Sequence, residues 1–319
     1  MLKIIRTGLF VLLTAVTLPA SAVAGTACPP VAEQPTPEVL QAAMHNARDR
    51  GFLWRISKDG RTSFLYGTIH VAKLDWIFPG PSVAQAMHST DTVALELDML
   101  DADIQDRIAR GMVALHGTAL PESLAQRMRQ QADAVCVPYD AIARLSPEMQ
   151  IEMLSMMVGR WEGLDASYAI DAVLAGMGHG AKKTVVSLET PESQLQVLQM
   201  HSPQETLTFV REGLDELETG RSRAMLSRIA RIWADADYAE MDRFDEWCEC
   251  LDTEIERVMM KRALDERNPN LADRIDALHR SGKQVFAAVG SLHMFGPVGL
   301  PALMAKRGYS VDRVDLNPL

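Results

Sequence analysis

The stretch Thr62-Ser-Phe-Leu-Tyr-Gly67-Thr-Ile-His70 is a β-type apolar run that closes with the pattern G-x-x-H, and Gln284-Val-Phe-Ala-Ala-Val-Gly290-Ser-Leu-His293 repeats it near the other end of the chain. Each run is followed by Pro or Gly, a short helical pattern and a second strand. A glycine at a strand end permits a turn that other residues resist. The histidine is thereby delivered to the carboxyl edge of its strand, where open α/β sheets usually hold their sites. Two imidazoles presented in the same way predict one shared site.

A third match to the pattern, Gly176-Met-Gly-His179, has a different context. It ends a helical pattern, so we interpret His179 as part of a helix C-terminus, where histidine and glycine suit the unpaired carbonyl groups. Only the first two matches close a β-type run and lead into a helix and another strand.

The order of these units predicts an α/β (α+β) fold. Its mixed sheet is built from two strand–GxxH–helix–strand units, with a large helical insert between them at about residues 101–182 and 202–282. A short apolar run, 183–189, predicts a buried strand between the two helical stretches. We expect residues 25–319 to form a single domain.

Residues 1–24 have the organisation of a signal peptide. Lys3 and Arg6 form a basic start, an apolar run follows, and small residues before Val23 or Gly25 provide a cleavage site. The apolar run is too short for a permanent membrane anchor, although an uncleaved interfacial helix or a lipid on Cys28 are alternatives. We therefore expect a periplasmic or secreted protein without an integral membrane segment after cleavage.

Charge and cysteine content limit the function further. The formal net charge is −10, and loss of Lys3 and Arg6 makes it −12, which argues against nucleic acid as a partner. In an exported protein, the four cysteines make at least one disulfide plausible. Cys248-Glu-Cys250 resembles half of a metal site, but no second half completes it. We expect these two to pair with Cys28 and Cys136, in a connectivity that the spacing does not define.

His70 and His293 are the first candidates for metal ligands, because neutral imidazole is the commonest protein ligand for a metal. Glu96 lies in the apolar strand predicted at residues 92–98, where a carboxylate is costly unless it is paired or ligated. Glu189 ends a second apolar strand, just before a helix start. Each candidate also has a plainer explanation. His70 and His293 could be turn histidines that satisfy backbone groups, and Glu96 could be a strand-end acid in water. Glu189 could be an acid that the dipole of the following helix stabilises.

Arg267-Asn268-Pro269 is a further polar candidate, with an equally good explanation as the N-cap of a helix that begins with proline. The common hydrolase motifs H-E-x-x-H and G-x-S-x-G, the P-loop, and a G-x-G-x-x-G after a strand do not occur in the sequence.

These segments together resemble the TraB/GumN family, the bacterial relatives of the animal Tiki proteins. The resemblance extends from about residue 50 to 315. The matching segments are Leu65 to His70, Ala94 to Asp98, Gly163 to Asp165 with Tyr168 and Asp171, Ser187 to Thr190 with Gln194, Arg267-Asn268, and Ala288 to His293 with Gly296 and Gly299.

The resemblance implies a fold like that of the erythromycin-esterase and ChaN-like proteins. It also implies a metal-dependent hydrolase site, with peptidase activity and manganese- or cobalt-type ions attributed to the Tiki branch. Carried over by position, the metal-proximal or catalytic residues are His70, Glu96, Glu189 and His293, with Arg267 and Asn268 as polar support.

We therefore expect an exported metal-dependent hydrolase, most directly a peptidase, that acts on a peptide or small-molecule substrate. His70, His293 and Glu96 would hold the metal, and the other carboxylate would act as general base. Ligands of this kind admit Mn, Co, Fe or Zn. Two alternatives are a periplasmic protein that binds a peptide or haem without catalysis, and a metal-independent, esterase-like hydrolase in which a His/Glu pair activates water.

Overall fold

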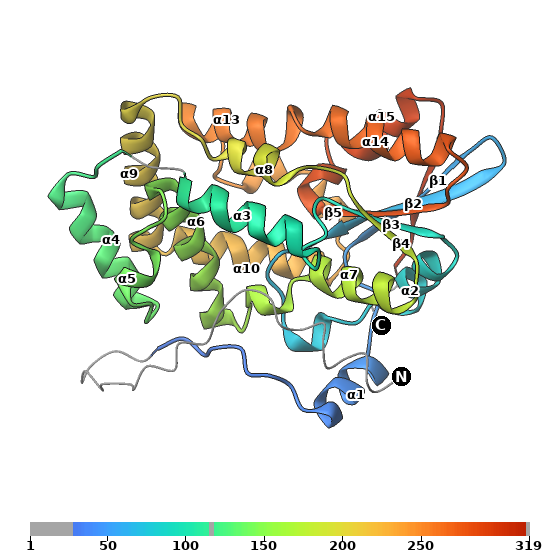
Figure 1. Cartoon of the computed structure of the whole chain (residues 1–319), viewed down its shortest axis with the longest axis horizontal. Coiled ribbons are helices and arrows are strands. Elements are labelled where there is room, and N and C mark those ends of the chain that lie inside the picture. The colour runs from blue at the N-terminus through green and yellow to red at the C-terminus, as the bar shows by residue number, and fades with distance from the viewer. Residues whose placement is uncertain (1–27, 115–117, 317–319) are drawn as a thin grey trace.

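The computed structural model describes residues 28–114 and 118–316. The predicted signal peptide, residues 1–24, lies outside this part of the chain. The predicted mixed α/β architecture is confirmed: a six-stranded sheet lies among many helices (Figure 1). The strands are β1 (Phe52–Lys58), β2 (Arg61–Thr68), β3 (Thr92–Leu95), β4 (Thr184–Ser187), β5 (Val285–Gly290) and β6 (Ser310–Val314).

The sheet has the strand order β4-β3-β5-β2-β1-β6. Strands β4, β3, β5 and β2 are mutually parallel, whereas β1 runs antiparallel to both β2 and β6. The two G-x-x-H units therefore interlock, because β5 of the second unit lies between β2 and β3 of the first. This arrangement brings the carboxyl ends of four strands to one edge of the sheet.

The central strands are apolar because helices cover both faces of the sheet. Every residue of β3 and β5 is buried, and they lie in one core cluster with Trp233, Leu174 and Leu271. Helix α7 (Ile170–Gly180) packs against β3 and β4, whereas α14 (Asn268–Arg280) packs against β5 and α15 (Leu300–Lys306) against β1 and β6. In Figure 1 these two groups of helices lie on opposite sides of the sheet.

A second core lies in the helical insert. Helices α4 (Glu122–Ala134), α6 (Pro147–Met157) and α9 (Pro203–Thr219) pack around Met128, Leu154 and Val210, at the end of the molecule away from β1 (Figure 1). The helix starts follow the expected caps. Ser146 accepts a hydrogen bond from Met149 N at the start of α6, and Pro147 occupies its first turn.

The remaining helices lie outside these two groups. They are α1 (Pro37–His45), α2 (Pro81–His88), α3 (Ala102–Ala114), α5 (Tyr139–Ile142), α8 (Pro191–Val197), α10 (Arg221–Ala234), α11 (Tyr238–Met241), α12 (Phe244–Trp247) and α13 (Glu254–Met260). Single-turn elements are η1 (Leu74–Trp76), η2 (Val158–Glu162), η3 (Ala166–Tyr168) and η5 (Ser291–Met294), with the π-helical turn η4 (Lys261–Asp265). Within the described ranges, none of these helices is long and apolar enough to cross a bilayer.

Three local expectations were wrong. The strand predicted to reach residue 98 ends at Leu95, so Glu96 lies just beyond β3 rather than inside it. The run 183–189, expected to be a buried strand, forms the edge strand β4, which is only partly buried. Asn268 does not cap its helix, because α14 begins at Asn268 and its side chain bonds elsewhere.

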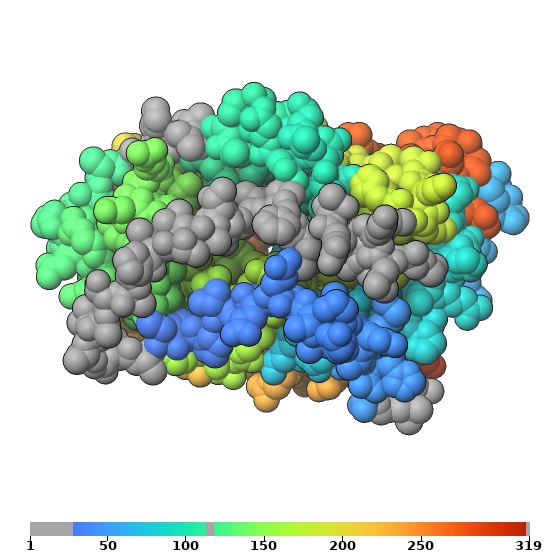
Figure 2. Space-filling view, turned by 60° about the horizontal axis from the view of Figure 1, so that its bottom comes forward, coloured from blue at the N-terminus to red at the C-terminus, as the bar shows by residue number. Residues whose placement is uncertain are grey.

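Disulfides form among the cysteines, but not in the combination expected. Cys28 bonds to Cys136, and Cys248 bonds to Cys250. The first bond ties the N-terminal segment to the helical insert, and Tyr168 Oη donates a hydrogen bond to the Glu33 carbonyl farther along that segment. Figure 2 shows this segment (blue) lying over the outside of the molecule.

The two disulfides should differ in their effect on stability. Replacing Cys28 and Cys136 by serine should lower the free energy of unfolding by about 2–5 kcal/mol, because a cross-link over a long loop restricts the unfolded chain most. The control is the pair Cys248→Ser and Cys250→Ser, whose loop spans only two positions, with an expected loss about a third as large. Urea unfolding measures both, and equal losses would contradict this account.

Candidate functional site

Four chain segments meet at the carboxyl edge of the parallel strands. His70 follows β2, Glu96 follows β3, Glu189 follows β4 and His293 lies in the turn after β5. The segments after β3 and β4 stay together beyond the strands, because Glu189 N donates to the Glu96 carbonyl at 3.0 Å. Residues far apart in the sequence are thus neighbours at this edge.

Gly290 is the point around which these side chains gather. Its backbone N–H donates to Glu96 Oε1 at 2.7 Å. A Cβ atom at this position would lie 3.3 Å from both Glu96 Oε1 and His70 Nε2, and 3.6 Å from His293 Cδ2. Because both atoms lie 3.3 Å from the same point, the distance between His70 Nε2 and Glu96 Oε1 is at most twice 3.3 Å. The glycine of the second G-x-x-H pattern leaves room for the two imidazoles and the carboxylate, which a larger residue would push back by a few tenths of an ångström.

His70 is oriented by a carboxylate that the sequence did not single out as a site residue. Asp171, in the first turn of α7, accepts from His70 Nδ1 at 2.9 Å and from Thr68 Oγ1 at 2.6 Å. The charge of Asp171 raises the pKa of His70 above its usual range. The imidazole remains accessible, with 58% of the side chain exposed.

His293 has the opposite environment. Its side chain is only 5% exposed, and burial lowers the pKa of the imidazole to about 4. Asn268 fixes its tautomer: Asn268 Nδ2 donates to the Val298 carbonyl at 2.9 Å, so its Oδ1 must accept from His293 Nδ1, at 2.5 Å. The lone pair of the neutral ring is then on Nε2, which lies 3.9 Å from Glu96 Oε1.

Arg267 holds the two carboxylates in place. Its Nε donates to Glu189 Oε1 at 2.9 Å, and its Nη2 donates to Glu96 Oε2 at 2.6 Å and also to Glu189 Oε2. Its Nη1 donates to the carbonyl of Ala263, within the π-helical turn η4. All three side chains are largely buried.

Gln194 completes the polar group from the start of α8. Its Nε2 donates to Glu96 Oε2 at 2.9 Å and to Glu189 Oε2 at 3.1 Å. Burial alone would raise the pKa of Glu96, but the charges of His293, which is protonated in acid, and of His70 and Arg267 outweigh burial and lower this pKa to about 2. Glu96 is therefore ionised at neutral pH, with Oε1 directed toward Gly290 and Oε2 toward Arg267.

The structure thus brings together all six candidates from the sequence. Asp171, Thr68 and Gln194 were missed as site residues, although all three lie in segments that carried the family resemblance. The local signal of Asp171 and Gln194 is only a polar residue near the start of a helix, and that of Thr68 is a polar residue at a strand end. His179 lies in the last turn of α7, as expected, and its Nε2 contacts Asp98 at 2.7 Å instead of joining this group.

The donor atoms at Gly290 have the chemistry that a divalent transition metal requires. His70 Nε2 and Glu96 Oε1 both face Gly290, and His293 Nε2 lies 3.9 Å from the same Oε1. Asp171 and Asn268 orient the rings through Nδ1, as outer partners of metal-bound histidines do. Within residues 28–114 and 118–316, however, no three His, Cys, Asp or Glu side chains already stand in a metal-holding arrangement. A metal would have to draw these groups closer together and displace a proton from His70.

Comparison with known proteins gives one match. A family model described as the TraB/PrgY/gumN family matches residues 52–313, which is nearly the whole chain and includes every residue of this site. No curated protein and no solved structure matches the chain.

Removing Arg267 should destabilise the fold strongly. Arg267→Ala leaves two buried carboxylates without their shared cation, and we expect a loss of about 3–5 kcal/mol in the free energy of unfolding near neutral pH. The depressed pKa of Glu96 contributes stability at neutral pH, and this contribution disappears as the pH falls toward that pKa. The loss caused by Arg267→Ala should therefore shrink in acid.

Urea unfolding at neutral and acidic pH checks this prediction. The control is Arg223→Ala, whose ion pair with Glu162 is exposed at the surface and should contribute less than about 1 kcal/mol. Similar losses for the two variants would contradict a central role for Arg267.

The two histidines should titrate far apart. Because Asp171 is the largest cause of the raised pKa of His70, Asp171→Asn should return this pKa toward about 6.5. The low pKa of His293 arises first from burial and should change little. NMR titration of the imidazole resonances in chelator-treated protein measures both, and an unchanged His70 titration would refute the assignment.

Proposed function

The chain belongs to the TraB/PrgY/gumN family, and on that premise we propose that it is an exported, metal-dependent hydrolase that cleaves peptides. The observation that carries the proposal is the convergence at Gly290. There, His70 Nε2 and Glu96 Oε1 face Gly290 together, His293 Nε2 lies 3.9 Å from the same Oε1, and both imidazoles are oriented through Nδ1.

His70, His293 and Glu96 would hold the metal, which would be Mn, Co, Fe or Zn. Such an ion, when bound, polarises a carbonyl group and makes water a better nucleophile. The exposed side of His70 provides the approach for a substrate, whereas the buried side is closed by Asn268 and the turn after β5.

The remaining carboxylate, Glu189, is our candidate for the general base. Arg267 engages both of its oxygens, and Gln194 engages Oε2 as well. Glu189 would therefore accept a proton only when one of these hydrogen bonds is released. Arg267 and Asn268 act as positioning residues in this scheme, because they bond to Glu96 and to His293.

A metal-independent hydrolase is the second candidate, and the His70–Asp171 pair favours it. A histidine that is open to solvent and backed by a partly buried carboxylate can exchange protons with water, and His70 would act as the base once it has lost its own proton, which its raised pKa places above neutral pH. In that case Arg267 would neutralise Glu96 permanently and His293 would only shape the site.

Metal analysis combined with activity separates the two candidates. The mature protein, purified without a histidine tag, is tested for bound metal and for cleavage of a panel of peptides and esters before and after chelation. For the metal enzyme we expect one ion per chain, loss of peptide cleavage on chelation and recovery when a divalent ion is restored. Full activity without any metal would favour the second candidate.

Variants test the ligand assignment. His70→Ala and His293→Ala should each remove most of the ion and nearly all activity, and the double variant should be little worse, because ligands of one site act as a unit. Glu189→Gln should retain the ion but lose turnover. The matched control is His179→Gln in the third G-x-x-H pattern, which should keep both the ion and activity. If His179→Gln lost the ion while His70→Ala and His293→Ala kept it, the assignment of His70 and His293 as ligands would be wrong.

A further inference from the structure

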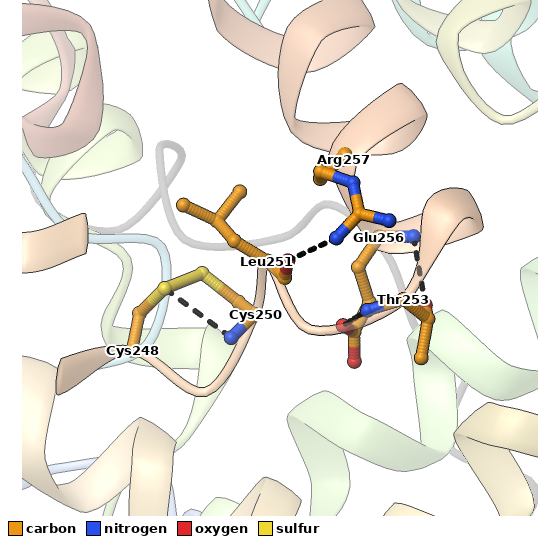
Figure 3. Close-up of a disulfide and its surroundings, with 6 residues drawn as sticks. All are labelled: Cys248, Cys250, Leu251, Thr253, Glu256 and Arg257. Carbon is orange, nitrogen blue, oxygen red and sulfur yellow. Dashed lines mark hydrogen bonds between the residues drawn. A yellow bond between two sulfur atoms is a disulfide. The ribbon is translucent and has the colours of Figure 1, made fainter. Parts of the chain in front are cut away.

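The disulfide between Cys248 and Cys250 lies in the turn between α12 and α13, and Figure 3 shows it with its surroundings. The hydrolase proposal makes no use of it. The segment after it is fixed: Thr253 and Glu256 form a capping box at the start of α13, and Arg257 donates to the carbonyl groups of Leu251 and Asp252. The two cysteines are thus held in a defined turn.

This bond does little to hold distant parts of the fold together. Its cysteines are separated by two positions in the sequence, whereas Cys28 and Cys136 are separated by 108. A cross-link over such a small loop removes little freedom from the unfolded chain. Stabilisation of the fold therefore does not explain the disulfide between Cys248 and Cys250.

The turn is also strained. Glu249, between the two cysteines, has a φ of 47°, a left-handed conformation that residues other than glycine rarely adopt. Cys136, in the other disulfide, has a similar φ of 54°, so the small loop that Cys248–Cys250 closes, and not backbone conformation alone, sets the two bonds apart. Disulfides that are strained or accessible are the ones that exchange readily.

A cavity of about 170 Å³ lies against the disulfide. Cys248, Glu249 and Cys250 line it together with Glu216, Arg221, Met225, Arg228 and Trp247. Its size suits one side chain of another polypeptide rather than a large ligand. Cys248 is fully buried, but Cys250 is partly exposed, so an incoming thiol reaches Cys250 more easily.

The surroundings favour a thiolate on Cys248. The backbone N–H of Cys250 lies 3.2 Å from Cys248 Sγ, in position to donate a hydrogen bond. Arg221 brings positive charge to the same cavity, whereas Arg228 is paired with Glu240. Glu216 supplies a proton acceptor: burial, and then the charge of Glu256, raise its pKa to about 7. A carboxyl group of this kind can take the proton of an entering thiol and return it to a leaving one.

We propose that Cys248–Cys250 is a redox-active disulfide that oxidises pairs of cysteine thiols in other polypeptides. A substrate thiolate attacks Cys250 Sγ, the bond between Cys250 and Cys248 breaks, and its electron pair goes to Cys248 Sγ. The second substrate thiolate then attacks the substrate sulfur of the mixed disulfide and releases Cys250 as a thiolate. The substrate gains a disulfide and loses two electrons, and the two cysteines of this chain take up those electrons and two protons.

The first experiment uses the unmodified mature protein in glutathione buffers of increasing reducing strength. Alkylation and mass spectrometry report each disulfide separately. Cys248–Cys250 should open at ratios where Cys28–Cys136 remains closed, although both Cys28 and Cys136 are the more exposed. If Cys28–Cys136 opens first, or both open together, the proposal is wrong.

The second experiment follows the exchange itself with a reduced synthetic peptide that carries two cysteines. One equivalent of peptide should be oxidised per unmodified chain, and none by the variant with Cys248→Ser and Cys250→Ser. The His70→Ala variant should still oxidise one equivalent, so failure of the hydrolase proposal and failure of this one are distinguishable. No peptide oxidation by the unmodified chain would overturn the proposal.

The third experiment identifies the attacked sulfur. The single variants Cys248→Ser and Cys250→Ser are mixed with a peptide whose one cysteine is blocked by thionitrobenzoate, and release of the coloured thiol is followed. The Cys248→Ser variant should react faster, because it retains the partly exposed Cys250, whereas the Cys250→Ser variant retains only the buried Cys248. Equal rates, or a faster Cys250→Ser variant, would contradict the assigned roles.

Discussion

The ion pairs between Arg267 and the carboxylates of Glu96 and Glu189 are the interaction on which the rest of the site depends. Two buried carboxylates a few ångströms apart repel each other and are costly to desolvate. One guanidinium group neutralises both carboxylates, because its donors form hydrogen bonds with three of their four oxygens. With Oε2 so engaged, Glu96 keeps Oε1 for Gly290 N and faces the two imidazoles. The geometry at Gly290 is therefore a consequence of the charge on Arg267.

The edge of the sheet could be predicted because its signals are local. The apolar runs before Gly67 and Gly290 have strand periodicity, and a glycine followed by histidine at the end of each run places His70 and His293 at the carboxyl edge. Parallel pairing of β2, β5 and β3 then makes them neighbours. The extent of β3 was overestimated, because alternation continues through Glu96 in the sequence although the ladder ends at Leu95.

The supporting residues could not be predicted because their roles depend on contacts across the fold. Asn268 before Pro269 is a good helix cap by local rules, yet its amide fixes the tautomer of His293. Asp171 and Gln194 are ordinary first-turn residues until the sheet brings His70 and Glu96 beside them. The cysteine pairing likewise follows from the position of each chain segment in space, which spacing in the sequence does not encode.

An anomalous-scattering map from crystals grown without chelator and soaked in manganese tests the central claim most directly. The account predicts one strong peak beside Gly290, in contact with Nε2 of His70, Nε2 of His293 and Oε1 of Glu96, with Arg267 still bound to Glu96 Oε2. A map with no peak at this position, from crystals whose dissolved protein cleaves peptides only when manganese is present, would contradict it.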